Sequence, residues 1–208
     1  MKKIWLALVG FMLAFSVSAA TFSDGKQYTT LDKAIPGAPK VVEFFSFFCP
    51  HCYDFERTYR INQALEDGLP QGVKLTRYHV DFLGGDFAPV VTHAWAVAMA
   101  LGVEGKVVDP IFDGIQKSQT ITDQASLKAA FLKASGITSE EYDAAWNSFA
   151  VKALVSEQQK AATDFNINGV PSVFVNGKYL VNNAGLDTSS MNNFVADYVN
   201  VVKYLVSK

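Results

Sequence analysis

Cysteine is scarce in this chain, which has 2 cysteines among 208 residues, and neither sign of charge dominates. The 18 lysines and arginines stand against 20 aspartates and glutamates, which gives a net charge of −2. Without a basic excess the chain cannot replace the counterions of a phosphate backbone, which argues against a nucleic-acid partner. With two cysteines it also cannot carry the several cross-links that stabilise many small exported domains.

Long apolar runs are equally scarce. The pronounced one covers residues 4–15 and falls short of the ~20 residues that a membrane-spanning helix requires. Two lysines precede this run, and small residues up to Ala19 follow it. This three-part pattern predicts a cleaved signal peptide at residues 1–19 and therefore an exported protein.

The two cysteines, Cys49 and Cys52, are three positions apart. A disulfide between them would close a very small loop and remove little entropy from the unfolded chain. Such a bond is a poor structural brace, so the spacing favours a redox function.

The first half of the chain has the pattern of a strand–helix–strand unit. Residues 26–31 and 41–48 are predicted strands, and the second is almost continuously apolar, as in a strand buried on both faces. A helix is predicted over residues 50–67, and an alternating strand over residues 73–80. The strands on either side of the helix are expected to be parallel.

The second half begins with helical patterns over residues 84–148 and returns to strands afterwards. A capping box at residues 138–141 is expected to open a long helix that continues to Asp164. Residues 172–175 and 178–181 flank Asn176-Gly177, which is a strong hairpin signal, and a last helix follows residue 190. The order predicts an α/β fold with one mixed sheet and an all-helical domain inserted within it.

The cysteine pair lies where the buried strand meets the helix. Pro50 suits the first turn of a helix, where its missing N–H costs nothing. Cys49 would then lie at the helix start, close to free backbone N–H groups that stabilise a thiolate. Cys52 follows nearly one turn later, ready to resolve a mixed disulfide. This placement predicts thiol–disulfide exchange.

Histidines near the cysteines suggest two further possibilities. His51 lies between them and, as a cation or an N–H donor, would lower the pKa of Cys49; it could also be a solvated helix-start residue. A zinc site that combines the cysteines with His79 or His93 lacks a second ligand pair, so no metal is expected.

Three charged residues are candidates for proton transfer. Glu43 interrupts the apolar strand, where a carboxylate is costly to bury unless it is paired or functional. It either relays protons to Cys52 or emerges at a sheet edge. Glu56 and Arg77 are its natural companions, although their residue types favour a polar cluster that caps the core. Farther along, Val170-Pro171 precedes a strand, where a proline is tolerated at the first position.

Long segments of the chain resemble the DsbA family of periplasmic disulfide-forming proteins. They are residues 44–53 (FFSFFCPHCY), 94–102 (AWAVAMALG), 141–149 (EYDAAWNSF), 169–171 (GVP) and 174–179 (FVNGKY). The resemblance implies a thioredoxin fold formed by residues 20–82 and 149–208, with a helical domain inserted at residues 83–148.

The same resemblance implies roles for individual residues. Cys49 would be the nucleophile with the low pKa and Cys52 the buried cysteine. Val170-Pro171 would be a cis-proline loop that faces the disulfide, and Glu43 would match the family's buried acid. Family members often carry Lys at the position of Arg77, and arginine cannot give up its proton, which argues against proton shuttling there.

The resemblance also implies partners and a compartment. We expect a periplasmic monomer that oxidises unfolded exported proteins through its own disulfide, without a further cofactor. A membrane partner linked to quinone, similar to DsbB, would reoxidise it.

Three other functions remain open. A reductase or isomerase would need a higher Cys49 pKa, and isomerases usually add a dimerisation domain. A glutathione-dependent transferase usually lacks the second cysteine. A chaperone-like binding module would keep its function after a Cys49→Ser substitution, whereas an oxidase would lose it.

Overall fold

The structure, a computed structural model, describes residues 22–208, so the predicted signal peptide at residues 1–19 lies outside the described residues. A five-stranded sheet has the order β1-β5-β4-β2-β3. Strand β2 is parallel to β3 and antiparallel to β4, and β5 is antiparallel to β4 and β1, which confirms the predicted mixed sheet. The strands are β1 (Tyr28–Thr30), β2 (Val41–Phe45), β3 (Leu75–His79), β4 (Ser172–Val175) and β5 (Tyr179–Val181).

Strand β2 is buried along its whole length. Val41 packs into the apolar cluster that helices α2 (Ile61–Gly68) and α8 (Met191–Val206) share with one face of the sheet. Val42 and Phe44 point into a second cluster, which contains Phe174. Burial on both faces explains why the strand's sequence is nearly all apolar instead of alternating.

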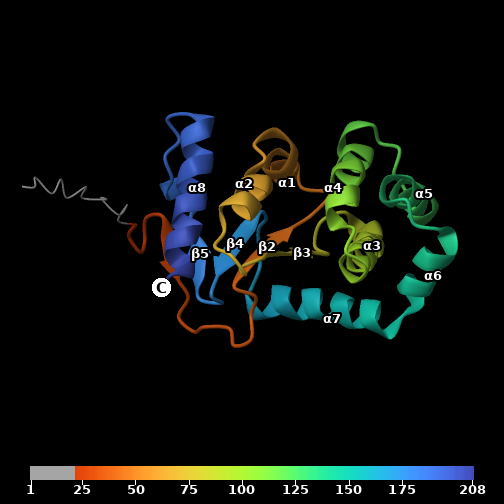
Figure 1. The fold of residues 1–208 in the computed structure, drawn as a ribbon, viewed down its shortest axis with the longest axis horizontal. Coiled ribbons are helices and arrows are strands. Elements are labelled where there is room, and N and C mark those ends of the chain that lie inside the picture. The colour runs from red at the N-terminus through yellow and green to blue at the C-terminus, as the bar shows by residue number, and fades with distance from the viewer. Residues whose placement is uncertain (1–21) are drawn as a thin grey trace, which may run out of the picture.

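Helices cover both faces of the sheet (Figure 1). Helices α2 and α8 lie on one side, and α7 (Phe149–Asp164) runs along the other and contacts α3, α6 and β3. The helical insertion lies beyond the edge formed by β3 (Figure 1). Its helices are α3 (Ala88–Leu101), α4 (Glu104–Phe112), α5 (Gln124–Ser135) and α6 (Ser139–Asn147). The predicted fold class, a thioredoxin-like sheet with a helical insertion, is confirmed.

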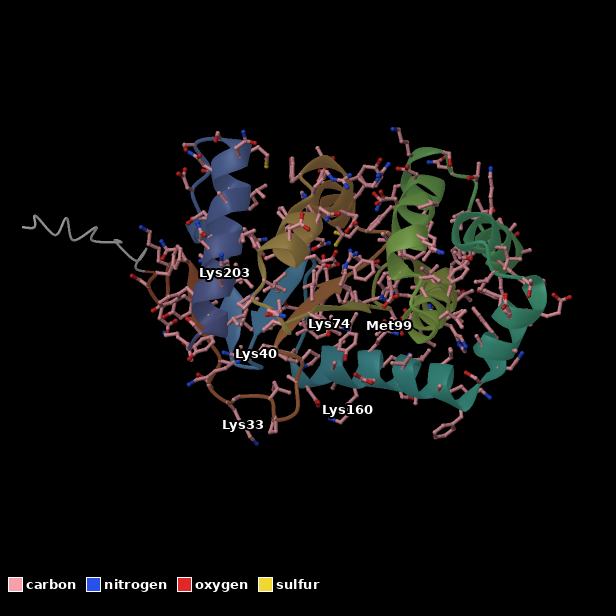
Figure 2. All side chains as sticks on the ribbon, in the orientation of Figure 1. Lys33, Lys40, Lys74, Met99, Lys160 and Lys203 are labelled. Carbon is pink, nitrogen blue, oxygen red and sulfur yellow. The ribbon has the colours of Figure 1, made fainter. Side chains whose placement is uncertain are left out.

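The insertion has an apolar core of its own that reaches the sheet. Trp95, Phe112 and Phe131 are buried in one cluster with Phe45 and Phe47, which come from the end of β2 and the turn after it. Side chains fill the space between α3 and the sheet, where Met99 contacts the cores of both (Figure 2). The insertion therefore packs directly against the segment that leads to Cys49.

The helix predicted over residues 50–67 is broken. It consists of α1 (Pro50–Tyr53), a π-helical turn η1 (Asp54–Thr58) and α2 (Ile61–Gly68). Arg60 has a left-handed backbone, with φ of 52°, which ends the first segment and changes the direction of the chain. The prediction of a continuous helix was wrong because the apolar spacing carries through this kink.

The long helix predicted from residue 138 to Asp164 is also broken. Helix α6 ends at Asn147, and Ser148 is extended, with its hydroxyl accepting a hydrogen bond from the N–H of Val151 at 3.1 Å. Ser148 thereby caps the start of α7, since a serine hydroxyl competes well for free N–H groups at a helix start. The capping box at Thr138 and Glu141 is confirmed.

The strand predicted over residues 41–48 ends early, at Phe45. The hydroxyl of Ser46 accepts the N–H of Phe48 at 3.1 Å, a local bond that replaces strand pairing. The predicted hairpin is confirmed, because Asn176 and Gly177 join β4 to β5 with φ of 56° and 62°, as a type I′ turn requires. Within residues 22–208, no helix has the length and apolar character of a membrane span.

Candidate active site

Cys49 occupies the N-cap of α1, directly after the turn that follows β2. Its backbone is extended, with φ of −90° and ψ of 118°, and its N–H donates to the carbonyl of Ser46 at 3.1 Å. Pro50 begins the helix, and Tyr53 N–H donates to the Cys49 carbonyl at 3.0 Å. The predicted placement of the cysteine pair at a strand-to-helix junction is confirmed.

The two cysteines are free thiols in different surroundings. A hydrogen bond from the Cys52 thiol and the backbone N–H groups of Cys52 and His51 lower the pKa of Cys49 to about 6, against the effect of burial. Burial, the hydrogen bond to Cys49 and the charge of Cys49 raise the pKa of Cys52. Near neutral pH the pair therefore favours a thiolate at Cys49 and a protonated thiol at Cys52.

His51 is exposed at the start of α1. Its charge lowers the pKa of Cys49. This effect is smaller than those of the hydrogen bonds from Cys52 and from the backbone N–H of His51 itself. The sequence pattern had predicted both contributions, that of the free backbone N–H groups at the helix start and that of the His51 side chain. A free N–H at a helix start acts on a neighbouring anion whatever the side chain is.

The other two histidines lie in packed surroundings. His79 is buried, its Nδ1 is 2.7 Å from the hydroxyl of Thr92, and burial lowers its pKa to about 3. His93 stacks on Trp146 with ring centroids 4.0 Å apart. Across the described residues 22–208, no group of three or more His, Cys, Asp and Glu side chains has an arrangement suited to a metal ion.

The loop at Val170 meets the cysteines from 121 positions away in the sequence. The thiol of Cys49 donates a hydrogen bond to the carbonyl of Val170, with Sγ and O 3.3 Å apart. The Val170-Pro171 peptide bond is cis. A groove of about 410 Å³ opens beside this contact, and His51, Tyr59 and Phe194 are among the residues that line it with Val170 and Pro171. The structure thus brings the two predicted segments together.

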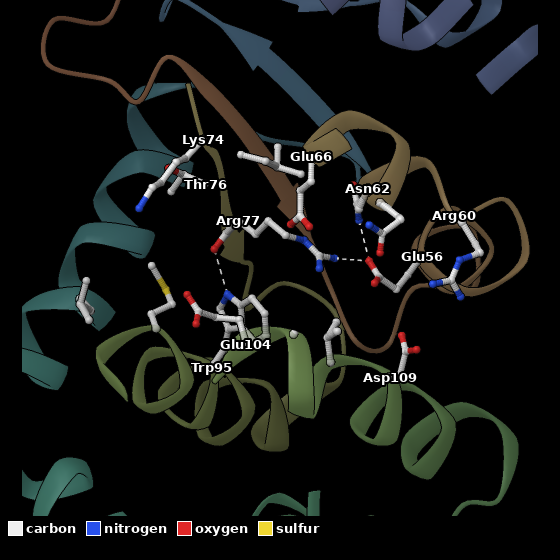
Figure 3. A pocket seen from close by; sticks show the side chains of 16 residues that line it. Glu56, Arg60, Asn62, Glu66, Lys74, Thr76, Arg77, Trp95, Glu104 and Asp109 are labelled. Atoms are coloured by element: carbon white, nitrogen blue, oxygen red, sulfur yellow. Dashed lines mark hydrogen bonds and ion pairs between the residues drawn. The ribbon is translucent and has the colours of Figure 1, made fainter. Parts of the chain in front are cut away.

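Glu43, Glu56 and Arg77 form a buried cluster. Glu43 lies opposite Arg77 in the register of the parallel strands β2 and β3, which puts their side chains on one face. Arg77 Nε donates to Glu43 Oε2 at 2.6 Å, and Arg77 Nη2 is 2.8 Å from Glu56 Oε2. Figure 3 shows Arg77 and Glu56 paired beside a polar cavity of about 520 Å³. The alternative that Glu43 emerges at a sheet edge is wrong, because its side chain is 1% exposed.

Asn62 completes this cluster and was not singled out in the sequence. Its amide nitrogen donates to Glu56 Oε2 at 2.8 Å (Figure 3). It also donates to Glu43 Oε1 at 3.3 Å. Burial nevertheless raises the pKa of Glu43, although Arg77 and Asn62 favour the carboxylate. A lone asparagine in a helical pattern gives no sequence signal for such a contact.

A family model described as the DSBA-like thioredoxin domain matches residues 40–198, a range that contains the cysteines, the Glu43 cluster and the Val170 loop. The chain belongs to the DsbA family. It is 60% identical to the thiol:disulfide interchange protein DsbA of Escherichia coli K12 over 208 residues, which are the whole of both chains. It is 56% identical to the DsbA of Yersinia pestis, again over the full length of both.

Solved structures agree with this assignment. A DsbA of Proteus mirabilis with a non-covalently bound peptide, PWATCDS, superposes with a TM-score of 0.87 and 49% identity. The match covers 91% of this chain and 100% of the other. The DsbA disulfide interchange protein of Klebsiella pneumoniae superposes with a TM-score of 0.86 at 37% identity, over the same shares of the two chains. The chain is therefore a disulfide-forming thiol–disulfide oxidoreductase.

Proposed function

We propose that the chain is a periplasmic disulfide oxidase that transfers its Cys49–Cys52 disulfide to reduced, unfolded exported proteins. One observation carries the proposal: Cys49 occupies the N-cap of α1, where hydrogen bonds from Cys52 and from the backbone N–H of His51 lower its pKa to about 6, while burial raises the pKa of Cys52. A stabilised Cys49 thiolate favours the reduced form of the enzyme, and a couple whose reduced form is favoured is a strong oxidant.

In the first step, a substrate thiolate attacks Cys49 Sγ of the disulfide. The bond between Cys49 and substrate forms, and the bond between Cys49 and Cys52 breaks. Cys52 receives the electron pair and takes up a proton, because burial disfavours its thiolate. The product is a mixed disulfide at Cys49.

In the second step, another thiolate of the substrate attacks the substrate sulfur of the mixed disulfide. A substrate disulfide forms, and Cys49 leaves as a thiolate. Because the pKa of Cys49 is low, it is a good leaving group. Over both steps the substrate loses two electrons and the enzyme becomes a dithiol, so the electrons balance.

Pro50 and His51 support this chemistry from the first turn of α1. Pro50 starts the helix without leaving an N–H unpaired. His51 contributes its backbone N–H and its charge to the stabilisation of the Cys49 thiolate.

Glu43 is the proposed proton donor to Cys52 in the first step. Burial raises its pKa, so it holds a proton more readily than an exposed glutamate. Its charge raises the pKa of Cys52, so the two groups lie within electrostatic reach. Glu56 lines the polar cavity and would exchange protons with solvent, while Arg77, always protonated and charged, orients both carboxylates and transfers no proton itself.

The Val170 loop and the adjacent groove form the proposed platform for the substrate. The Val170 carbonyl oxygen lies 3.3 Å from Cys49 Sγ, so a chain bound there lies beside the reacting sulfur. An extended peptide can pair with such a backbone edge whatever its side chains are. The Proteus mirabilis relative binds the peptide PWATCDS non-covalently, which supports peptide binding as such.

The remaining parts of the proposal follow from family membership. Residues 20–82 and 149–208 would form the thioredoxin-like domain, and residues 83–148 the insertion. After each cycle, a membrane partner linked to quinone, similar to DsbB, would reoxidise the dithiol. The enzyme would act as a monomer with no cofactor besides its own disulfide.

The proposal is tested by single-turnover transfer. The oxidised protein is mixed with an equal amount of a reduced, unfolded polypeptide that has two cysteines, and free thiols are counted by alkylation and mass spectrometry. We expect the polypeptide to lose two thiols while Cys49 and Cys52 each gain one. A Cys49→Ser variant should transfer nothing. A chaperone-like binder would instead suppress aggregation equally well with or without Cys49.

A further inference from the structure

A side chain of the helical insertion reaches the turn that carries Cys49. Gln116 lies in a π-helical turn, η3 (Asp113–Lys117), which follows α4. Its amide nitrogen donates to two carbonyls of the segment between β2 and α1: that of Phe47 at 2.7 Å and that of Cys49 at 3.0 Å. Gln116 thus binds the backbone on both sides of Phe48.

The carbonyl of Phe47 depends on this contact. Phe47 is fully buried, and within residues 22–208 its carbonyl accepts no hydrogen bond other than the one from Gln116. A buried carbonyl without a donor costs about 1–3 kcal/mol. The turn before Cys49 would therefore rearrange if the amide were removed.

The carbonyl of Cys49 determines where the helix points. It belongs to the peptide unit that joins Cys49 to Pro50, and it accepts the N–H of Tyr53 as well as the amide of Gln116, so both donors hold ψ of Cys49, which is 118°. That angle fixes the direction of the first turn of α1 relative to the Cys49 side chain. The N–H groups of His51 and Cys52 lie in this turn, and both lower the pKa of Cys49.

The same turn holds the chain after the cysteines. The carboxylate of Asp113 accepts the hydroxyl of Tyr53 at 2.8 Å and Nη2 of Arg57 at 3.0 Å. Contacts from one short turn of the insertion therefore bracket the cysteine pair from both sides.

The turn itself is firmly built. The carbonyl of Gly114 accepts the N–H groups of Thr120 and Ile121, at 2.9 and 3.1 Å. A Cβ atom at Gly114 would lie 2.4 Å from the end of the Ile121 side chain, so a larger residue there would force Ile121 to shift. Phe112 and Phe47 pack against each other with ring centroids 4.6 Å apart, which anchors the turn to the Cys49 segment.

We propose that Gln116 is a positioning residue for the disulfide chemistry: by holding the carbonyls of Phe47 and Cys49, it keeps the N–H groups at the start of α1 directed at Cys49 Sγ. This inference rests on the proposed function of Cys49. The helical insertion thereby sets the oxidising strength of the cysteine pair, in addition to covering the edge of the sheet.

Two substitutions test the inference. Gln116→Ala removes the side chain, and Gln116→Glu keeps its size while removing both N–H donors. Gln63→Ala is the matched control, because Gln63 is exposed and its amide nitrogen donates to Asp67 on the same helix. For each protein, the Cys49 pKa is measured from the pH dependence of alkylation, and the redox equilibrium with glutathione is measured separately.

We expect both Gln116 variants to raise the Cys49 pKa by about 0.5 unit or more, which corresponds to about a threefold loss of thiolate stabilisation. The equilibrium with glutathione should shift by the same factor towards the disulfide, and Gln63→Ala should change neither quantity. If the variants lose thermal stability but keep the Cys49 pKa and the equilibrium, Gln116 is a structural brace and the inference is refuted.

Failure of both Gln116 variants to fold would refute it equally, since the residue would then serve the fold. A failure of the proposed function looks different. In that case the unmodified protein already has a Cys49 that titrates near pH ~8.5, as a free thiol does.

Discussion

The stability of the reduced protein should depend on pH in a way that the oxidised protein cannot share. Only the reduced form has a titratable thiol at Cys49. The perturbation is a decrease in pH from about 8 to about 5, with the free energy of unfolding measured for both forms. The contributions of groups that titrate in both forms, such as Glu43, cancel to first order when the free energies of unfolding of the two forms are subtracted.

The size of the effect follows from the pKa of Cys49, which is about 6 in the folded protein. In the unfolded chain it should be about 8.5, and each pKa unit corresponds to about 1.4 kcal/mol. Because the folded pKa is depressed, the stabilisation is complete above about pH 8.5 and is lost as the pH falls through about 6. Between about pH 8 and pH 5 the reduced form should therefore lose about 2.5 kcal/mol relative to the oxidised form.

The titration of Cys52 sets the upper limit of the pH range in which the two forms can be compared in this way. Its folded pKa is raised, so it destabilises the reduced form only as the pH rises past the unfolded value of about 8.5. Denaturant unfolding at successive pH values, with excess reductant for one series, gives the difference directly. A reduced Cys49→Ser variant should lack the pH-dependent step. A difference that stays flat over this range would show that Cys49 has an ordinary pKa, and the reasoning would fail.

Substitutions at three positions extend the test to other parts of the site. Replacing His51 with Leu should raise the Cys49 pKa, measured by alkylation, and make the disulfide less oxidising; an unchanged pKa would mean that the backbone N–H groups suffice. Arg77→Met leaves Glu43 buried without its partner and should cost about 3–5 kcal/mol in denaturant unfolding. Arg77→Lys should cost much less, and an equal loss in both would contradict the pairing. Gly84→Ala should destabilise by about 1–3 kcal/mol, because its Cβ would lie 2.3 Å from the ring of Phe48; an unchanged midpoint would contradict this packing.

Features encoded by short stretches of sequence could be predicted. The cysteine pair follows an apolar strand and precedes a proline that starts a helix, so its placement at a strand-to-helix junction follows from local rules. The hairpin at Asn176-Gly177 is equally local, because its turn type requires positive φ at both positions. The capping box at Thr138 specified a helix start correctly.

Features that depend on contacts between distant segments could not be predicted. The left-handed Arg60 and the extended Ser148 each break a helix whose apolar spacing continues across the break. Gln116 acts on carbonyls 67 and 69 positions away, and no property of its own neighbourhood marks it. Asn62 likewise joins Glu43 and Glu56 only because α2 folds back over β2.

The Val170 loop could be predicted only in part. The residues themselves specify only a proline at the start of a strand, and the approach to Cys49 was expected from family resemblance alone. The contact between Cys49 Sγ and the Val170 carbonyl spans 121 positions and is produced by the pairing of β4 with β2. The sheet topology, which local patterns do not encode, brings the two segments together.

The central claim is that the surroundings of Cys49 make the Cys49–Cys52 disulfide an oxidant. The most direct test is the equilibrium of this couple with reduced and oxidised glutathione at about pH 7, where the lowered Cys49 pKa alone contributes about 1.4 kcal/mol, or about 30 mV. The account predicts that the couple favours the dithiol about tenfold more than a pair of ordinary thiols does at the same concentrations of reduced and oxidised glutathione. A couple no more oxidising than a pair of ordinary thiols would contradict it.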